Sequence, residues 1–162
     1  MVGITPNDMY EPNNGYTIMP CTPELALSVG HNLREDDRRE VEQTTGLTAE
    51  AAIIESYYGS TYDQCVYFEN PNGKAAGVAG VTPQNIIWML CTDDSSESPI
   101  AFVRKARGWV NSLSNPYLMN VADMRNESHI KLLKLLDFKF IRYYVYKNVP
   151  LIEFIKICVH QH

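Results

Sequence analysis

A run of six apolar residues, IIWMLC from Ile86 to Cys91, constrains the fold of this chain more than any other feature. A turn at Pro83–Asn85 precedes the run and the acidic stretch TDDSSESP follows it, which leaves a segment with the length of a strand. A strand that is apolar at every position is typical of the middle of a sheet covered on both faces. We therefore expect a sheet with helices on each side.

Strands and helices alternate around this run. The sequence pattern predicts further strands at Tyr16–Pro20, 61–70, 74–81, Tyr117–Ala122, 138–147 and 151–159, the last two joined at Asn148–Pro150 as a closing hairpin. Capping residues predict helices that begin after Thr22, Thr48, Ser98 and Asn126. The segment Arg34–Gly46 is highly charged and is predicted to be a solvated helix extension or loop.

This order of elements predicts an α/β (α+β) fold: a mixed, mostly antiparallel sheet of about six to seven strands, with about four helices on both faces. A length of 162 residues suits one domain, which we place at residues 16–162. Residues 1–15 are polar and contain Pro6, Pro12 and Gly15, so we expect them to form a flexible N-terminal arm.

Composition excludes several classes of function. The formal net charge of −5 argues against a nucleic-acid-binding module, which usually carries a basic stripe. No apolar run approaches the roughly 18 residues of a membrane span. The histidines lack the spacing of metal ligands; they are His31, His129, His160 and His162. The cysteines form no C-x-x-C pair, so we expect buried, reduced thiols and a reducing cytoplasm; they are Cys21, Cys65, Cys91 and Cys158.

Two resemblances emerge from these elements. Over Tyr16–Val159 their order is similar to that of the GNAT superfamily of N-acetyltransferases. The segment NESHIKLLKLL from Asn126 to Leu136, followed by an aromatic strand, resembles the internal virion protein A family of short-tailed, autographivirus-type bacteriophages. Together they imply a phage-encoded protein with a GNAT-like fold, located in the host bacterial cytoplasm, with the virion as a second expected location.

The GNAT resemblance implies a cradle for the pyrophosphate of acetyl-CoA between the fourth strand and the next helix. Such a cradle needs glycines and free backbone N–H groups. The matching stretch, Thr92–Pro99, contains no glycine and carries three acids, Asp93, Asp94 and Glu97, that repel phosphate. The weak candidates for contacts with acetyl-CoA are Ser96, Ser98, Arg104, Asn126 and Ser128.

The same resemblance implies a tyrosine acid on the helix after the fifth strand, and a general base. The position that matches the tyrosine is Leu133, which has no proton to give. His129, one helical turn earlier, and Asp123, at the end of the fifth strand, are the weak catalytic candidates.

These observations favour a GNAT-like protein without acetyl transfer or a cofactor, acting as an internal virion or assembly component or as a host-interaction protein. Its partner would be a virion protein or a host bacterial protein, bound at Thr92–Glu97 or Arg34–Glu42, both of which are polar and have no obvious role in the core. Two alternatives stay open. One is an active or divergent acetyl-CoA-dependent N-acetyltransferase, and the other is an inhibitor of a host defence protein.

Overall fold

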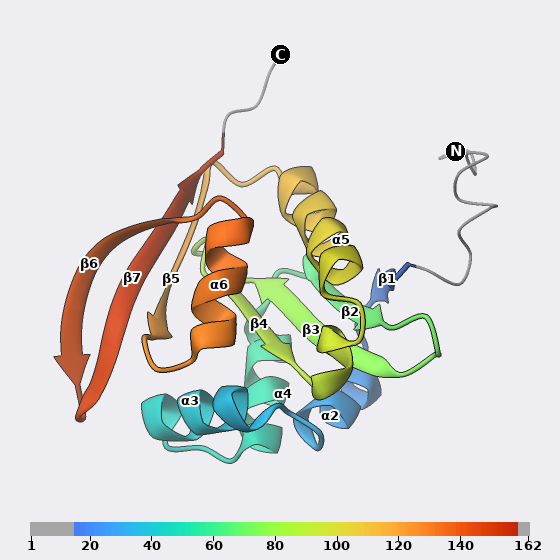
Figure 1. Cartoon of the computed structure of the whole chain (residues 1–162), viewed down its shortest axis with the longest axis horizontal. Coiled ribbons are helices and arrows are strands. Elements are labelled where there is room, and N and C mark those ends of the chain that lie inside the picture. Colours follow the sequence, from blue (N-terminus) through green and yellow to red (C-terminus); the bar gives the residue numbers. More distant parts are fainter. Residues whose placement is uncertain (1–14, 159–162) are drawn as a thin grey trace.

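The computed structural model describes residues 15–158, so the predicted arm at residues 1–15 lies almost entirely outside the described part. The described strands form two sheets, in the orders β1-β2-β3-β4 and β5-β7-β6, which meet where β4 lies beside β5 (Figure 1). The mixed α/β architecture with mostly antiparallel strands is therefore confirmed. The single sheet that the pattern suggested is divided in two at this boundary.

The first sheet is antiparallel throughout and contains β1 (Thr17–Pro20), β2 (Cys65–Glu69), β3 (Ala75–Val81) and β4 (Ile87–Cys91). One face packs against α2 (Pro23–Gly30), α3 (Glu35–Thr45) and α4 (Ala49–Gly59), and the other against α5 (Pro99–Ser112). Alternation along β3 shows the two faces directly. Val78 packs with Val29 and Ile53 of the helices on one side, whereas Ala79 belongs to the core that contains Phe102 of α5.

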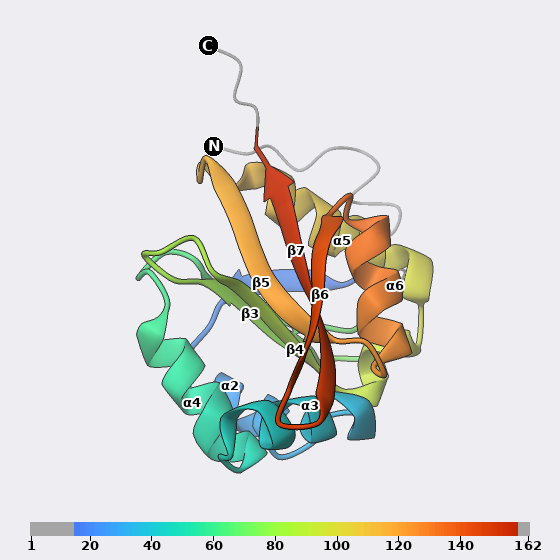
Figure 2. The ribbon, with the colours of Figure 1, turned by 90° about the vertical axis from the view of Figure 1, so that its left-hand side faces the viewer.

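The second sheet contains β5 (Tyr117–Asp123), β6 (Lys139–Tyr146) and β7 (Val149–Ile157), with β7 in the middle. The helix α6 (Glu127–Leu135) lies between this sheet and α5, and Leu133 shares a core with Phe154 of β7. Figure 2 shows β5, β7 and β6 in front of the other elements, with β6 at the edge of its sheet. The closing hairpin turns at Lys147 and Asn148, both with positive φ, so its turn comes one residue earlier than predicted.

Local signals predicted the helix starts well. The side chains of Thr22, Thr48 and Asn126 each accept a hydrogen bond from a backbone N–H in the first turn of the following helix, as expected of N-caps. Ser98 precedes α5 as predicted, but its side chain makes no capping hydrogen bond.

The charged segment Arg34–Gly46 was interpreted wrongly as a purely solvated stretch. It contains a regular helix, α3, whose Asp37 is only 3% exposed and whose Val41 is also buried. Residues 34, 37 and 41 recur at helical spacing, so one side of this helix faces inward although most of its residues are charged. This separate helix raises the number of α-helices in the described residues to five.

Three cysteines, Cys21, Cys65 and Cys91, are buried free thiols as predicted, whereas Cys158 is only half-buried. Within residues 15–158, no helix has the length and apolar character needed to cross a membrane. The same part of the chain holds no cluster of three histidine, cysteine, aspartate or glutamate side chains that could bind a metal ion.

Candidate functional site

The candidate site lies where the neighbouring strands β4 and β5 separate from each other. We call this opening between the two strands the fork. The two strands run parallel at a single bridge between Ile86 and Met119, where the N–H of Met119 donates to the carbonyl oxygen of Asn85 at 3.0 Å. Just beyond the bridge, the Asn120 amide spans the gap. Its Nδ2 donates to the oxygen of Ile87 at 2.7 Å, and its Oδ1 accepts from the N–H of Val121 at 2.7 Å. The strands separate after this point, which leaves edge groups on both that need other partners.

Two acids of α3 supply those partners. The Oδ2 atom of Asp37 accepts a hydrogen bond from the N–H of Cys91 on β4 at 2.8 Å. The Oε1 atom of Glu40 accepts one from the N–H of Asp123 on β5 at 3.1 Å. The helix that appeared solvated in the sequence therefore lies across the open end of the fork and caps both strands.

Asp37 is also the centre of a buried polar network. Its carboxylate accepts two hydrogen bonds from Nη2 of Arg34, at 3.0 and 3.2 Å, and one from Nδ2 of Asn126 at 2.8 Å. Asn126 is 1% exposed, so it serves the network and the cap of α6, and it has almost no surface left for a ligand. The positive charge of Arg34 compensates the negative charge of Asp37, as a buried ion pair requires.

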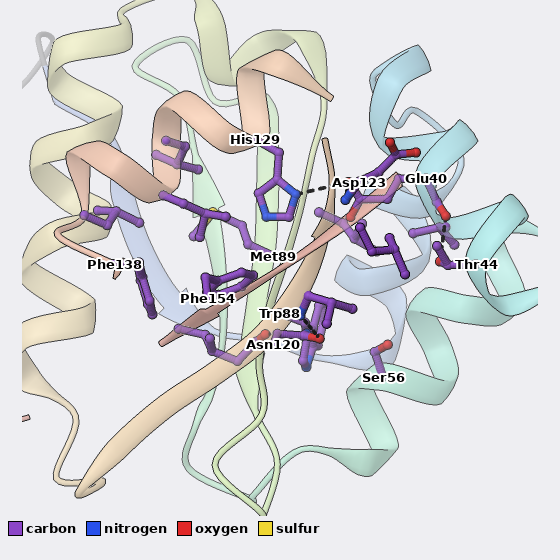
Figure 3. Close-up of a pocket in the computed structure, with 18 of the residues that line it drawn as sticks. Glu40, Thr44, Ser56, Trp88, Met89, Asn120, Asp123, His129, Phe138 and Phe154 are labelled. Atoms are coloured by element: carbon purple, nitrogen blue, oxygen red, sulfur yellow. Dashed lines mark hydrogen bonds and ion pairs between the residues drawn. The ribbon is translucent and has the colours of Figure 1, made fainter. Parts of the chain in front are cut away.

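A second polar pair lies next to this network. Nδ1 of His129 is 3.2 Å from Oε1 of Glu40, and both side chains are 14% exposed (Figure 3). Burial by itself would lower the pKa of His129, but the carboxylate of Glu40 outweighs it and the pKa is raised. The imidazole is therefore held in its charged form more strongly than a free histidine.

The His129–Glu40 pair lines a cavity of about 210 Å³ in the fork. Most of its wall is apolar and comes from β4, β7, α6 and the residues between α6 and β6, including Leu132 and Leu136. Phe138 and Phe154 point into this region (Figure 3). Leu133, at the position that the resemblance assigns to a tyrosine acid, also lines the cavity. The structure thus brings His129, Asp123 and Leu133 to one place.

Asp123 is poorly suited to accept a proton. Its carboxylate accepts hydrogen bonds from the backbone N–H of Arg125 at 2.9 Å and from Nη2 of the same residue at 2.7 Å. Burial would raise its pKa, but the hydrogen bonds from Arg125 prevail and the pKa is lowered. The thiol of Cys91 is also poorly suited to act as a nucleophile, because burial raises its pKa to about 12.

The stretch Thr92–Pro99, which the GNAT resemblance matches to the phosphate cradle, is held in place by Tyr16. The hydroxyl of Tyr16 donates to the carbonyl oxygens of Asp94 and Ser95, and it accepts from the N–H of Ser98 at 3.2 Å. The side chains of Thr92 and Ser95 are buried as well. The expectation that Thr92–Glu97 has no role in the core is therefore wrong.

A groove runs between α5 and α6, and the three acids of the stretch Thr92–Pro99 do not face it. Glu97 accepts hydrogen bonds from Asn70 and Asn72 in the turn between β2 and β3, and Asp93 and Asp94 line a hollow with Lys74. Their repulsion of an anion in the groove is thus weaker than the sequence suggested, because it acts from the other side of the loop.

That groove contains two of the five candidates for cofactor contacts. Ser96 and Ser128 line it together with the basic residues Arg34 and Lys131. Arg104 is exposed on α5 and does not line the groove. Ser98 and Asn126 do not line it either, and both have other hydrogen-bonding roles.

Sequence reasoning missed the residues that shape the fork: Arg34, Asp37, Glu40 and Asn120. For the first three the available signal was their spacing, because residues three apart share one face of a helix. For Asn120 there was no local signal, since one polar residue in a strand is ordinary.

Comparison with solved structures identifies the fold. The chain is similar to a GNAT-family acetyltransferase from Streptococcus pneumoniae, with 16% identity, a TM-score of 0.57, and coverage of 89% of this chain and 99% of the other. It is similar to one from Bacillus cereus at 10% identity and a TM-score of 0.63, covering 90% and 99%. A phosphinothricin acetyltransferase from Sinorhizobium meliloti, solved with acetyl-CoA, gives 13% identity and a TM-score of 0.63, covering 89% of each chain.

The chain therefore has a GNAT fold. No protein-family model matches it, and no curated protein matches it significantly. The resemblance of Asn126–Leu136 to internal virion protein A stays a prediction.

Proposed function

We propose that this GNAT-fold chain does not transfer acetyl groups and that it works by binding another protein, as an internal virion or assembly component of a phage or as a host-interaction protein. One observation carries the proposal: Asp37 and Glu40 of α3 lie across the open end of the fork and bond to the edges of both β4 and β5. The phage context rests on the likeness of Asn126–Leu136 to internal virion protein A. Inhibition of a host defence protein is one form of such binding.

The position of α3 affects acetyl transfer because it lies at the edge of β4, along which a bound cofactor would have to pass. The GNAT resemblance puts the phosphates at the start of α5 and the leaving thiolate near Leu133, so the arm between them runs along the edge of β4. The groove at α5 and the cavity at Leu133 share a single lining residue, Leu132. Its side chain therefore lies between the two hollows. The Cys91 N–H on this edge is already bonded to Asp37, so it is not free to donate to an extended arm.

The chemical groups near the cavity support the same reading. Leucine at position 133 has no proton to give to a leaving thiolate. The carboxylate of Asp123 is occupied by Arg125, and its lowered pKa makes it a weak base. Acetyl transfer would therefore lack both of the proton-transfer groups that the resemblance implies.

A surface suited to protein binding lies on β6. Four large apolar side chains are exposed on this edge strand: Ile141, Tyr143, Val145 and Tyr146. An edge strand presents unpaired backbone groups, and exposed apolar side chains on it favour contact with another chain. This strand replaces Arg34–Glu42 and Thr92–Glu97 as the surface that we associate with binding.

A second function, acetyl-CoA-dependent N-acetylation, has one specific observation in its favour. The His129–Glu40 pair lines the cavity, and an imidazolium with a raised pKa is able to donate a proton. By the alternation of a strand, the N–H of Met89 points to the same side of β4 as that of Cys91, toward the fork. Such an N–H suits an acyl oxygen.

Calorimetric titration of the purified chain with acetyl-CoA and CoA separates the two functions. We expect no saturable heat and no thermal shift up to millimolar ligand, because Leu132 separates the groove from the cavity and Asp37 already occupies the Cys91 N–H. Saturable binding at micromolar concentration would overturn the proposal and favour the transferase. Lys131→Glu then serves as the matched variant: it adds an acid to the groove between α5 and α6 and abolishes binding if the phosphates lie there.

A further inference from the structure

Cys21 and Cys65 lie opposite each other at the paired ends of the neighbouring strands β1 and β2. β1 and β2 pair in antiparallel fashion with Pro20 opposite Val66, so the next pair in this register is Cys21 and Cys65. The N–H of Cys21 donates to the carbonyl oxygen of Cys65 at 3.0 Å, which shows that the pairing continues to this position. Opposed residues in a hydrogen-bonded antiparallel pair have Cα atoms about 5.5 Å apart and side chains on the same face. That separation is typical of a disulfide.

The two thiols also differ in a way that favours exchange chemistry. Both thiols are free. Interaction with the Cys65 thiol lowers the pKa of Cys21, and the same interaction together with burial raises the pKa of Cys65. Cys21 is therefore the thiol that ionises first, and the thiolate is the attacking form. The exposed fractions are 8% for Cys21 and 7% for Cys65, so both are buried and a reagent reaches them when the structure opens locally.

We propose that Cys21 and Cys65 form a reversible disulfide by exchange with a small-molecule disulfide such as oxidised glutathione. The Cys21 thiolate attacks one sulfur of the reagent, the reagent's S–S bond breaks, and one glutathione thiolate leaves. The Cys65 thiol then loses its proton and attacks Sγ of Cys21, which expels the second glutathione. Two cysteine thiols are oxidised to one disulfide, and one glutathione disulfide is reduced to two thiols.

The position of this pair in the chain gives the bond a structural consequence. Residues 21–65 contain α2, α3 and α4, and α3 supplies Arg34, Asp37 and Glu40 to the fork. A disulfide closes this entire helical segment into a covalent loop. Because a cross-link restricts the unfolded chain more as the loop lengthens, we expect the oxidised form to melt about 5–15 °C higher than the reduced form.

Cys91 and Cys158 provide internal controls. The groups that act on the Cys91 thiol are Arg34, Asp37 and Ser95, and the group that acts on the Cys158 thiol is Lys156. Neither set contains a second cysteine. Exchange with the same reagent should therefore leave both thiols reduced in the folded chain, or at most convert the half-buried Cys158 to a mixed disulfide.

The test treats the purified full chain with oxidised glutathione, unfolds it, alkylates the remaining thiols and maps the peptides by mass spectrometry. We expect a linked peptide pair containing Cys21 and Cys65 that dithiothreitol releases. Cys65→Ser should trap glutathione on Cys21, whereas Cys91→Ser should form the same linkage as the parent. Alkylation of both Cys21 and Cys65 after treatment, or a linkage between other cysteines, would overturn the proposal. Comparing the melting temperatures of the oxidised and reduced parent tests it without any substitution, and an oxidised form that melts no higher contradicts the geometry.

Discussion

The Arg34–Asp37 pair gives the most direct test of how the fork is held. Replacing Asp37 with asparagine keeps the shape of the side chain but removes its charge and turns one acceptor oxygen into a donor. Arg34, with a side chain only 15% exposed, then loses the carboxylate that it pairs with, and an NH₂ group faces a donor at Cys91, Asn126 or Arg34. Removing one partner of a buried ion pair costs about 3–5 kcal/mol.

For a domain of this size, each kcal/mol corresponds to about 2–4 °C in melting temperature. Asp37→Asn should therefore lower the melting temperature by about 6–20 °C, and the free energy of unfolding in urea should fall by about 3–5 kcal/mol. Calorimetry and urea denaturation at pH 7 measure the two quantities independently.

Asp36→Asn is the matched control because it makes the same change one residue earlier in the same helix. Asp36 pairs with Arg39 at 3.1 Å with the same i,i+3 spacing as the 3.0 Å pair of Asp37, but its side chain is 45% exposed. Exposed ion pairs contribute about 0–1 kcal/mol. If the two variants lose similar stability, or if Asp37→Asn melts within about 2 °C of the parent, the reasoning about burial is wrong.

Three further predictions concern single residues. The raised pKa of His129 means that its pair with Glu40 stabilises the fold fully below the unfolded pKa of about 6.5, so the advantage of the parent over His129→Gln in melting temperature should shrink as pH rises from 6.5 toward 9 and should not grow. Tyr16→Phe removes the hydroxyl that holds the loop before α5 and should cost about 1–2 kcal/mol in chemical denaturation, whereas the fully exposed Tyr62→Phe should cost nothing measurable. Gly108 lies within α5 with no atom within 4 Å of an added Cβ, so Gly108→Ala should raise the free energy of unfolding by about 0.5–1 kcal/mol; a lower melting temperature would contradict the helical assignment.

The exposed strip on β6 was invisible to sequence reasoning for a different reason than the fork. The alternating residues of β6 predicted a strand, and that prediction holds for Lys139–Tyr146. Alternation does not tell an edge strand from a central one, because the pattern records only which faces are apolar. Ile141, Tyr143 and Val145 are exposed because β7, and not β6, occupies the middle of the sheet.

The candidate site also combines features that local sequence patterns predict with features that depend on the tertiary structure. The position of the helix after β5 is written locally, in the cap at Asn126 and the spacing of its leucines, and this placed His129 and Leu133 near each other before the structure was known. Glu40, which pairs with His129, lies 89 residues away from it in the sequence. No local pattern identified it, since charged residues on a helix are usually solvated.

What the sequence determined by itself is therefore most of the elements and their boundaries: the apolar run of β4, the capped starts of α2, α4 and α6, and the closing hairpin. These depend on propensities and hydrogen bonds within a few residues of one another. Only the tertiary structure decided that β4 and β5 separate and that α3 lies across the open end of the gap between them. Asp37, Glu40 and Asn126 become partners because packing brings distant segments together and removes water, after which each buried polar group must find another group of the protein.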